Sequence, residues 1–141
     1  MRRLIIASAL FLVAGAAAAQ VVTHDLKVQA LMANGVNPAA LAFWAGGNDP
    51  PDGETPAAAE GRWAAALKGA EDLQGHGRVL AGLSRPGRWN ADAQLMVETA
   101  GEGVAASRAR DAEKAFEIGG RLYDSCNGCH KAYIPTPSRL P

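Results

Sequence analysis

The chain has few of the features that mark β-rich or membrane-spanning proteins. Aromatic residues make up 6% of its 141 positions, and no stretch alternates β-branched with polar residues. After Gln20, no apolar run approaches the roughly 20 residues that a membrane-spanning helix needs. The sequence is instead rich in alanine, which favours helices over strands. We therefore expect an all-α domain with no stable membrane span.

The sequence also lacks an excess of charge of either sign, with 14 basic and 14 acidic residues. Nucleic acid is therefore not an expected partner, because its recognition depends on a surplus of lysine and arginine. The few lysines are scattered along the chain, so no docking face for another protein can be identified from them.

The first residues have the organisation of a secretory signal peptide. Met1–Arg3 is a short positive region, Leu4–Val13 is apolar, and Ala17–Ala19 supplies small residues for cleavage. The apolar run is too short for a membrane span, although an uncleaved anchor is the alternative. We expect a signal peptide over residues 1–19, export to the periplasm, and one domain over residues 20–141.

Proline, glycine and capping residues divide the rest of the chain into four predicted helices. The first runs from Val22 to Trp44, with Asn34-Gly35 and Pro38 bending or briefly interrupting it. The second runs over residues 56–83 behind the N-cap Thr55, and the third over residues 91–108 behind Asn90 or Asp92. The fourth is capped by Asp111 and runs to Tyr133.

The five residues Cys126-Asn127-Gly128-Cys129-His130 match the attachment sequence of a c-type haem. The two thiols can add to the two vinyl groups of a haem, and the histidine can bind its iron. On a helix, positions i, i+3 and i+4 share one face. A thioredoxin-like dithiol, a structural disulfide and half of a zinc site are the alternatives, but neither a βαβ pattern nor a second ligand cluster is present. We expect one haem c attached at Cys126 and Cys129, with His130 on the iron.

The predicted fourth helix carries a set of residues spaced by three or four: Phe116, Gly120, Tyr123, Cys126, His130 and Tyr133. This spacing predicts one stripe facing the interior. The pair Gly119-Gly120 would let another helix or the macrocycle approach closely. Four helices with mostly short connections describe an antiparallel four-helix bundle, with the covalently attached c-type haem near the C-terminus.

With this motif near the end of an exported helical bundle, the chain resembles the class II cytochromes c, the group of cytochrome c prime and its low-spin relatives. The resembling residues are Leu31-Met32, Trp63 and the segment Tyr123–Tyr133. The chain departs from cytochrome c prime at Ile134, where that family usually has arginine or lysine; Lys131 is the only nearby cation. The resemblance covers essentially residues 20–141 in architecture.

The resemblance implies that Met32 is the distal iron ligand, because low-spin members of the family use a methionine of the first helix. A thioether favours ferrous iron and raises the potential. Core packing is the alternative for Met32, as for most methionines. Met96 is a competing ligand that we expect to pack in the core, and His24 and His76 are competitors that we expect in solvent.

Two further groups of residues have an expected place near a haem. Partly buried propionates need cationic or hydrogen-bonding partners. The candidates for that role are Lys27, Arg62, Arg78 and Arg88. Large apolar side chains that could wall the pocket, or equally pack in the core, are Trp44, Trp63 and Trp89.

The expected function is periplasmic electron transfer through a His130/Met32 iron, with an unidentified redox partner. One alternative is a five-coordinate protein that binds nitric oxide or carbon monoxide. A second is a dithiol redox protein without haem. No second constellation, such as a distal His/Arg pair, accompanies the motif, so we do not expect an enzyme. A homodimer is a further expectation by analogy with the family.

Overall fold

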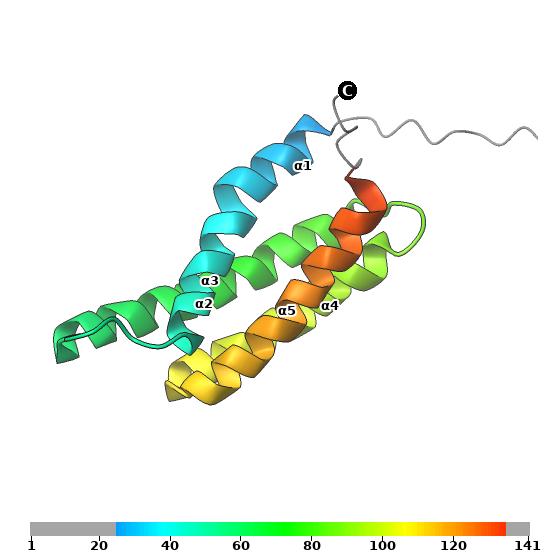
Figure 1. The fold of residues 1–141 in the computed structure, drawn as a ribbon. Coiled ribbons are helices and arrows are strands. Elements are labelled where there is room, and N and C mark those ends of the chain that lie inside the picture. The colour runs from blue at the N-terminus through cyan, green and yellow to red at the C-terminus, as the bar shows by residue number, and fades with distance from the viewer. Residues whose placement is uncertain (1–24, 135–141) are drawn as a thin grey trace, which may run out of the picture.

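The computed structural model describes residues 25–134, and every regular element in that range is a helix. The first rod consists of α1 (Leu26–Leu31), a π-helical segment (Met32–Val36) and α2 (Asn37–Gly47); α3 (Pro56–Gly82), α4 (Trp89–Ala109) and α5 (Ala112–Tyr133) follow. Successive rods run in opposite directions, which confirms the predicted antiparallel four-helix bundle (Figure 1). The predicted signal peptide over residues 1–19, the start of the first helix at Val22, and His24 lie outside the described residues.

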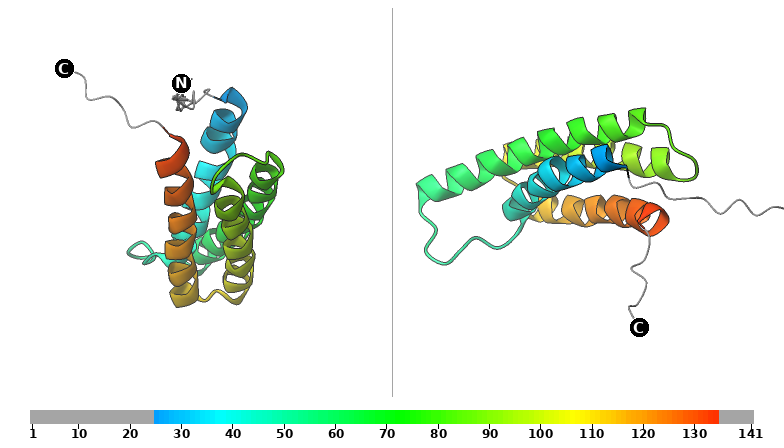
Figure 2. Two further views of the ribbon diagram at one scale, coloured as in Figure 1. Left: turned by 90° about the vertical axis from the view of Figure 1, so that its right-hand side faces the viewer. Right: turned by 90° about the horizontal axis from the view of Figure 1, so that it is seen from above.

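Small side chains allow the four rods to pack closely. Ala66 of α3 and Ala100 of α4 are fully buried, and the larger core residues Phe43, Leu73 and Leu122 fill the space between α2, α3 and α5. Burial of one such large side chain contributes about 1.5–3 kcal/mol. Seen from above in Figure 2, α2 lies between α3 and α5 and contacts both. Within the described range, none of the helices has the length and apolar character to cross a membrane.

The predicted irregularity in the first helix is confirmed and takes the form of a π-helical turn. Over Met32–Val36 the backbone widens, and the N–H of Asn37 donates to the carbonyl of Met32, five residues earlier. Pro38, which has no N–H to donate, lies in the first turn of α2. A Cβ at Gly35 would lie 2.8 Å from Nε2 of His76, so the glycine lets this turn approach α3.

Two of the predicted helix caps are confirmed. The hydroxyl of Thr55 accepts a hydrogen bond from the N–H of Ala58 at 3.2 Å, and Pro56 follows as the first residue of α3. The carboxylate of Asp111 accepts a hydrogen bond from the N–H of Lys114 at 2.9 Å at the start of α5. Both caps satisfy N–H groups that have no partner inside their helix.

The predicted cap of the third helix is wrong. The helix α4 begins at Trp89, and its N-cap Arg88 makes no hydrogen bond to the helix through its side chain. Asp92 lies inside the first turn, where it is buried and bound by Arg88. An aspartate near a helix start can therefore serve an ion pair with the residue four positions earlier instead of the backbone.

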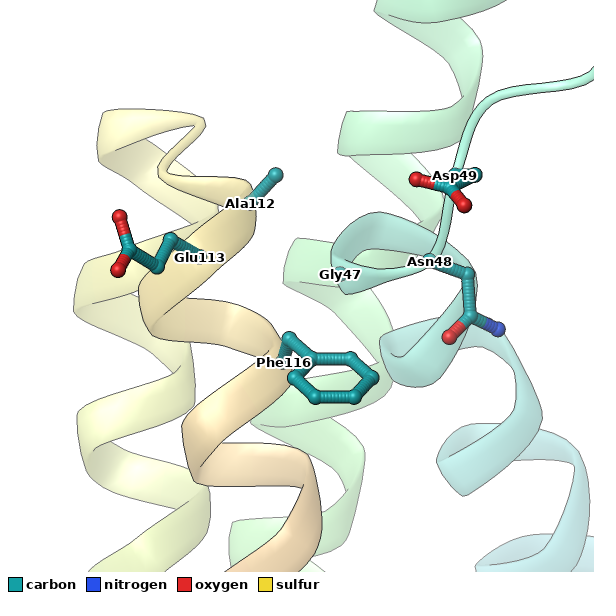
Figure 3. Close-up of a pocket in the computed structure, with 6 residues that line it drawn as sticks. All are labelled: Gly47, Asn48, Asp49, Ala112, Glu113 and Phe116. Carbon is teal, nitrogen blue, oxygen red and sulfur yellow. The ribbon is translucent and has the colours of Figure 1, made fainter.

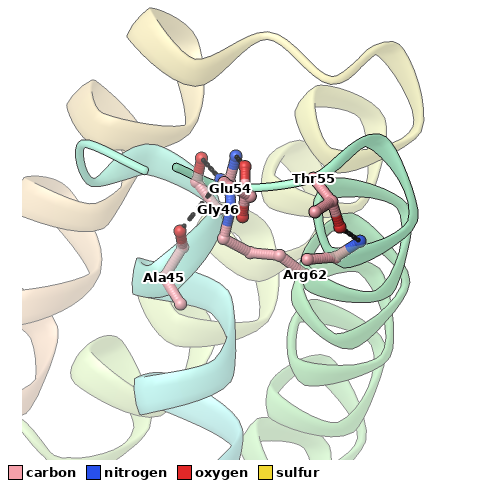
Figure 4. A network of polar contacts seen from close by, with 6 residues as sticks. Ala45, Gly46, Glu54, Thr55 and Arg62 are labelled. Carbon is pink, nitrogen blue, oxygen red and sulfur yellow. Dashed lines mark hydrogen bonds and ion pairs between the residues drawn. The ribbon is translucent and has the colours of Figure 1, made fainter. Parts of the chain in front are cut away.

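Arg62 fixes the loop between α2 and α3, as Figure 4 shows. Its Nε and Nη2 donate to the two carboxylate oxygens of Glu54 at 2.8 and 3.0 Å. Its Nη1 donates to the carbonyls of Ala45 and Gly46, both at 3.1 Å, and so satisfies acceptors at the C-terminal end of α2. Arg62, one of the propionate candidates, is thus already engaged by groups of the protein.

The predicted inward stripe of α5 is wrong for most of its members. Phe116 and Tyr123 are 68% and 56% exposed, and Gly120 and His130 are also exposed, whereas Cys126 and Tyr133 are half-buried. The buried positions of α5 are Ala115, Ile118, Gly119, Leu122, Ser125 and Gly128. The physical reason is that these mostly small residues let the backbones of α2 and α4 come close, which larger aromatic side chains would prevent.

Candidate functional site

The attachment sequence occupies the last turns of α5, which continues without a break to Tyr133. Cys126 and Cys129 are both half-buried free thiols, and His130 is exposed. Within the described part of the chain, the imidazole of His130 has no hydrogen-bond partner. Since the helix is regular here, the three side chains lie on one flank of α5, beside the strip that packs on α4.

The arrangement does not resemble a zinc site. Among residues 25–134, no three His, Cys, Asp or Glu side chains converge closely enough to hold a metal ion. Cys126, Cys129 and His130 therefore do not surround a single point, as tetrahedral zinc requires. Two thiols and an imidazole along one helix flank are suited to a larger group that each residue meets at a different atom.

Directly behind the motif, at the start of α4, lies an ion pair between exposed Arg88 and buried Asp92. Arg88 donates from Nε and Nη2 to the two carboxylate oxygens of Asp92, both at 2.7 Å. A Cβ at Gly128 would lie 2.5 Å from Oδ1 of Asp92 and 2.7 Å from Nη2 of Arg88. Only glycine therefore fits this position of the motif while the ion pair holds its place.

The environment of the two thiols keeps them protonated. Burial raises the pKa of the Cys126 thiol. Burial, and then the negative charge of Asp92, raise the pKa of Cys129 to about 11. A nucleophilic dithiol needs the opposite, because the thiolate is the reactive form and redox-active cysteines have a lowered pKa. The site is therefore poorly suited to thiol-disulfide exchange.

Tyr133 anchors the C-terminal end of α5 to the turn between α3 and α4. Its hydroxyl accepts a hydrogen bond from the backbone N–H of Trp89 at 3.0 Å and donates to the carbonyl of Pro86. The rings of Tyr133 and Trp89 meet edge to face, with their centres 5.1 Å apart. The indole of Trp89 also donates to the carbonyl of Leu80 at 2.7 Å. The end of α5 is thus fixed at two points, Gly128 within the attachment sequence and Tyr133 three residues beyond it.

The predicted distal ligand Met32 lies on a different rod. It is half-buried against the core and directly follows α1, which splays away from the C-terminal half of α5 in Figure 1. Farther along, α2 and α5 come together, where Nε1 of Trp44 donates to the carbonyl of Gly119 at 3.2 Å. The structure thus brings Cys126, Cys129 and His130 onto one flank of α5, with Met32 on the diverging rod.

The other candidates for iron ligation or propionate pairing lie in different environments. Met96 is 5% exposed, which confirms its predicted place in the core. His76, predicted in solvent, is half-buried, with its ring close to Gly35. Of the propionate candidates, Arg88 is bound by Asp92, while Lys27 and Arg78 are exposed.

Sequence reasoning missed the role of Asp92. Its position within the first turn of α4 suggested a cap, whereas the signal for the observed role is the four-residue spacing from Arg88 together with its place among buried α4 residues. That spacing alone does not predict burial, because most such pairs lie on a solvated face.

A shallow depression lies at the other end of α5, as Figure 3 shows. Its lining residues are Gly47, Asn48, Asp49, Ala112, Glu113 and Phe116. Phe116 is ten residues before Cys126, which corresponds to roughly 15 Å along a helix. This depression is therefore separate from the attachment sequence, and its two carboxylates have no cationic or nucleophilic partner within the lining.

Comparison of the chain with protein-family models, with curated proteins and with solved structures finds no match. A function therefore has to be argued from the residues themselves. The resemblance to class II cytochromes c stays a prediction, which depends on the segment Cys126–His130 and on its place in a four-helix bundle.

Proposed function

We propose that this chain is a periplasmic electron-transfer cytochrome of the class II type, with one haem c attached at Cys126 and Cys129. His130 is the proximal iron ligand in this proposal, and Met32 is the distal one. The observation that carries it is the flank of α5 on which two protonated thiols and an imidazole without a partner among residues 25–134 lie at positions i, i+3 and i+4. We propose electron transfer without an enzymatic activity of this chain.

The residues fit the group in their chemistry and in their surroundings. Thioether formation needs reduced cysteines, and both thiols are free. Iron ligation needs an imidazole with a free nitrogen, as exposed His130 has. The exposed ring of Tyr123 lies three residues before Cys126 on the same flank of α5, so a macrocycle on this flank would cover apolar surface that is open to solvent.

In this proposal the haem supplies a reversible one-electron change at its iron, and the protein controls the conditions of that change. Tyr133 and Gly128 hold the last turns of α5 in one position. His130 orients the iron, and the thioether of Met32 favours the ferrous state. A fixed ligand set allows electron exchange with little rearrangement.

The location and partner belong to the same proposal. A signal peptide over residues 1–19 would deliver the chain to the periplasm. The haem would be attached there, and the chain would exchange electrons with a periplasmic redox partner. The identity of that partner is not indicated by the described surface, in which most charged residues of α3, α4 and α5 are paired with one another. A homodimer is part of the proposal by analogy only.

One observation favours a second candidate, a five-coordinate protein that binds nitric oxide or carbon monoxide. The rod that carries Met32 splays away from the C-terminal half of α5, which would leave the distal side of the haem open (Figure 1). The dithiol alternative is disfavoured, because burial raises the pKa of both Cys126 and Cys129.

Denaturation of the purified full chain tests the proposal. A covalent haem stays with the polypeptide after unfolding and precipitation, whereas a dithiol protein is colourless. The double variant Cys126→Ser, Cys129→Ser should lose the covalent haem, and His130→Ala should lose the native absorption spectrum while the thioether bonds remain. A normal yield of red, covalently loaded protein from the double serine variant would exclude attachment at these cysteines.

A further inference from the structure

The ion pair between Arg88 and buried Asp92, behind the attachment sequence, has no assigned role in the proposed function. Asp92 is 3% exposed, and its carboxylate lies against the backbone of α5 at Gly128. A buried carboxylate is costly unless it is paired, and Arg88 supplies a two-point partner. An apolar residue would pack at this position of an alanine-rich core at lower cost, so the pair calls for a specific explanation.

The contact of Asp92 extends from Gly128 to the neighbouring cysteine. Asp92 lies against Gly128, the residue before Cys129, and burial together with the negative charge of Asp92 raises the pKa of the Cys129 thiol. The guanidinium of Arg88 lies on the same side of Gly128 as the Asp92 carboxylate, and its side chain is 61% exposed. The sulfur that would carry the second thioether bond therefore lies next to a buried negative charge, with a positive charge close behind it.

The edge of a haem that carries the vinyl groups is opposite the edge that carries the propionates. Arg88 lies against Gly128, next to Cys129, so in the proposed function it would lie near the vinyl edge and away from the propionates. Arg88 is instead the partner that offsets the charge of Asp92 at the attachment edge.

We propose that Asp92 and Arg88 form a charge pair that sets the reduction potential of the haem from its attachment edge, with Asp92 as a positioning residue that also requires glycine at position 128. This inference depends on the proposed function. Ferric iron carries one more positive charge than ferrous iron, so Asp92 stabilises the ferric state and Arg88 the ferrous state. Asp92 is 3% exposed, so water screens its charge little.

The opposite signs of the two charges give the proposal a distinctive test. In the full chain with haem attached, Asp92→Asn should raise the midpoint potential and Arg88→Gln should lower it. The double variant should return close to the wild type. A purely structural role would move both single variants in the same direction, because each would loosen the same contact between α4 and α5.

A matched control comes from another ion pair between the same two helices. Arg121 of α5 binds Glu102 of α4, but both side chains are more than two-fifths exposed. Arg121→Gln and Glu102→Gln are the control variants. Because Glu102 is 48% exposed and Asp92 is 3% exposed, water and salt screen the charge of Glu102 more strongly, and Glu102→Gln should shift the potential less than Asp92→Asn. If Asp92→Asn fails to fold, the more exposed Arg88→Gln keeps the test available.

A second readout does not depend on the iron. Gly128→Ala should lower the thermal stability of the purified protein, and the same change in an Asp92→Ala background should cost much less, because the obstructing carboxylate is gone. A colourless wild type would overturn the proposed function and this inference together. A red wild type would overturn the inference alone if the single variants shift in the same direction, or no more than the control variants.

Discussion

Two adjacent glycines of α5 allow a direct test of the packing between α2 and α5. A Cβ at Gly119 would lie 2.8 Å from Cδ1 and 3.1 Å from Nε1 of Trp44, whereas a Cβ at Gly120 meets nothing within 4 Å. The carbonyl of Gly119 also accepts the hydrogen bond from the indole of Trp44 at 3.2 Å. The same substitution at neighbouring positions should therefore have opposite effects.

The magnitudes follow from three contributions. Alanine in place of glycine within a helix stabilises by about 1 kcal/mol, and Gly120→Ala should show this gain alone. Gly119→Ala has the same gain, but overpacking costs about 1–3 kcal/mol. Displacement of Trp44 also weakens a hydrogen bond worth about 1 kcal/mol. Gly119→Ala should then be destabilised by about 1–3 kcal/mol, which separates the two variants by about 2–4 kcal/mol.

Urea unfolding of the purified full chain, followed by far-ultraviolet circular dichroism, measures both variants against the wild type. Equal slopes of the unfolding free energy against urea concentration would show that the variants differ in stability and not in the surface that unfolding exposes. A Gly119→Ala protein at least as stable as Gly120→Ala would refute the close approach of Trp44 to Gly119. A destabilised Gly120→Ala in haem-loaded protein would indicate that the macrocycle itself lies against Gly120.

Four further substitutions test the distal ligand and the local polar contacts. Met32→Ala should convert a low-spin haem to high-spin and lower its potential, whereas Met96→Ala should cost about 2–5 kcal/mol of stability and leave the spectrum unchanged; a wild type that is already high-spin would favour gas binding. The hydrogen bond from Arg62 lowers the pKa of Glu54 below its ordinary 4.5, so this contact stabilises the fold above that pH and is lost on acidification. Glu54→Gln should flatten that acid-side loss in thermal melts from pH 7 to pH 3. Thr55→Ala should cost about 1 kcal/mol in urea unfolding, and no loss would mean that its hydroxyl does not cap α3.

The limits of the helices could be predicted where the signal is local. Thr55 before Pro56, and Asp111 before α5, act on N–H groups within three residues, so neighbouring residues determine the outcome. The irregularity in the first helix is also local, because Pro38 lacks the N–H that would bond to the turn before it. The predicted end at Trp44 was three residues short of Gly47, since the carbonyls of Ala45 and Gly46 are satisfied by distant Arg62.

The buried face of α5 could not be predicted in this way. Periodicity finds residues that share a face, but it does not say which face meets another helix when small and large residues both recur every three or four positions. Gly119 and Gly128 are buried because Trp44 and Asp92 lie directly against them. Those two partners are 75 and 36 residues away in the sequence, so no local pattern identifies them.

The buried stripe of small residues on α5 determines where the exposed stripe of larger residues lies. A helix with its small residues against α2 and α4 has its larger apolar residues on the adjacent flank, and here that flank includes Phe116, Tyr123 and the attachment sequence. The spacing that predicted burial among helices therefore found a flank that a haem would partly cover in the proposed function. If so, haem attachment should protect Tyr123 from solvent while leaving distant Phe116 exposed, and Gly119 and Gly128 should keep their present contacts, because the protein already fills the space on that side.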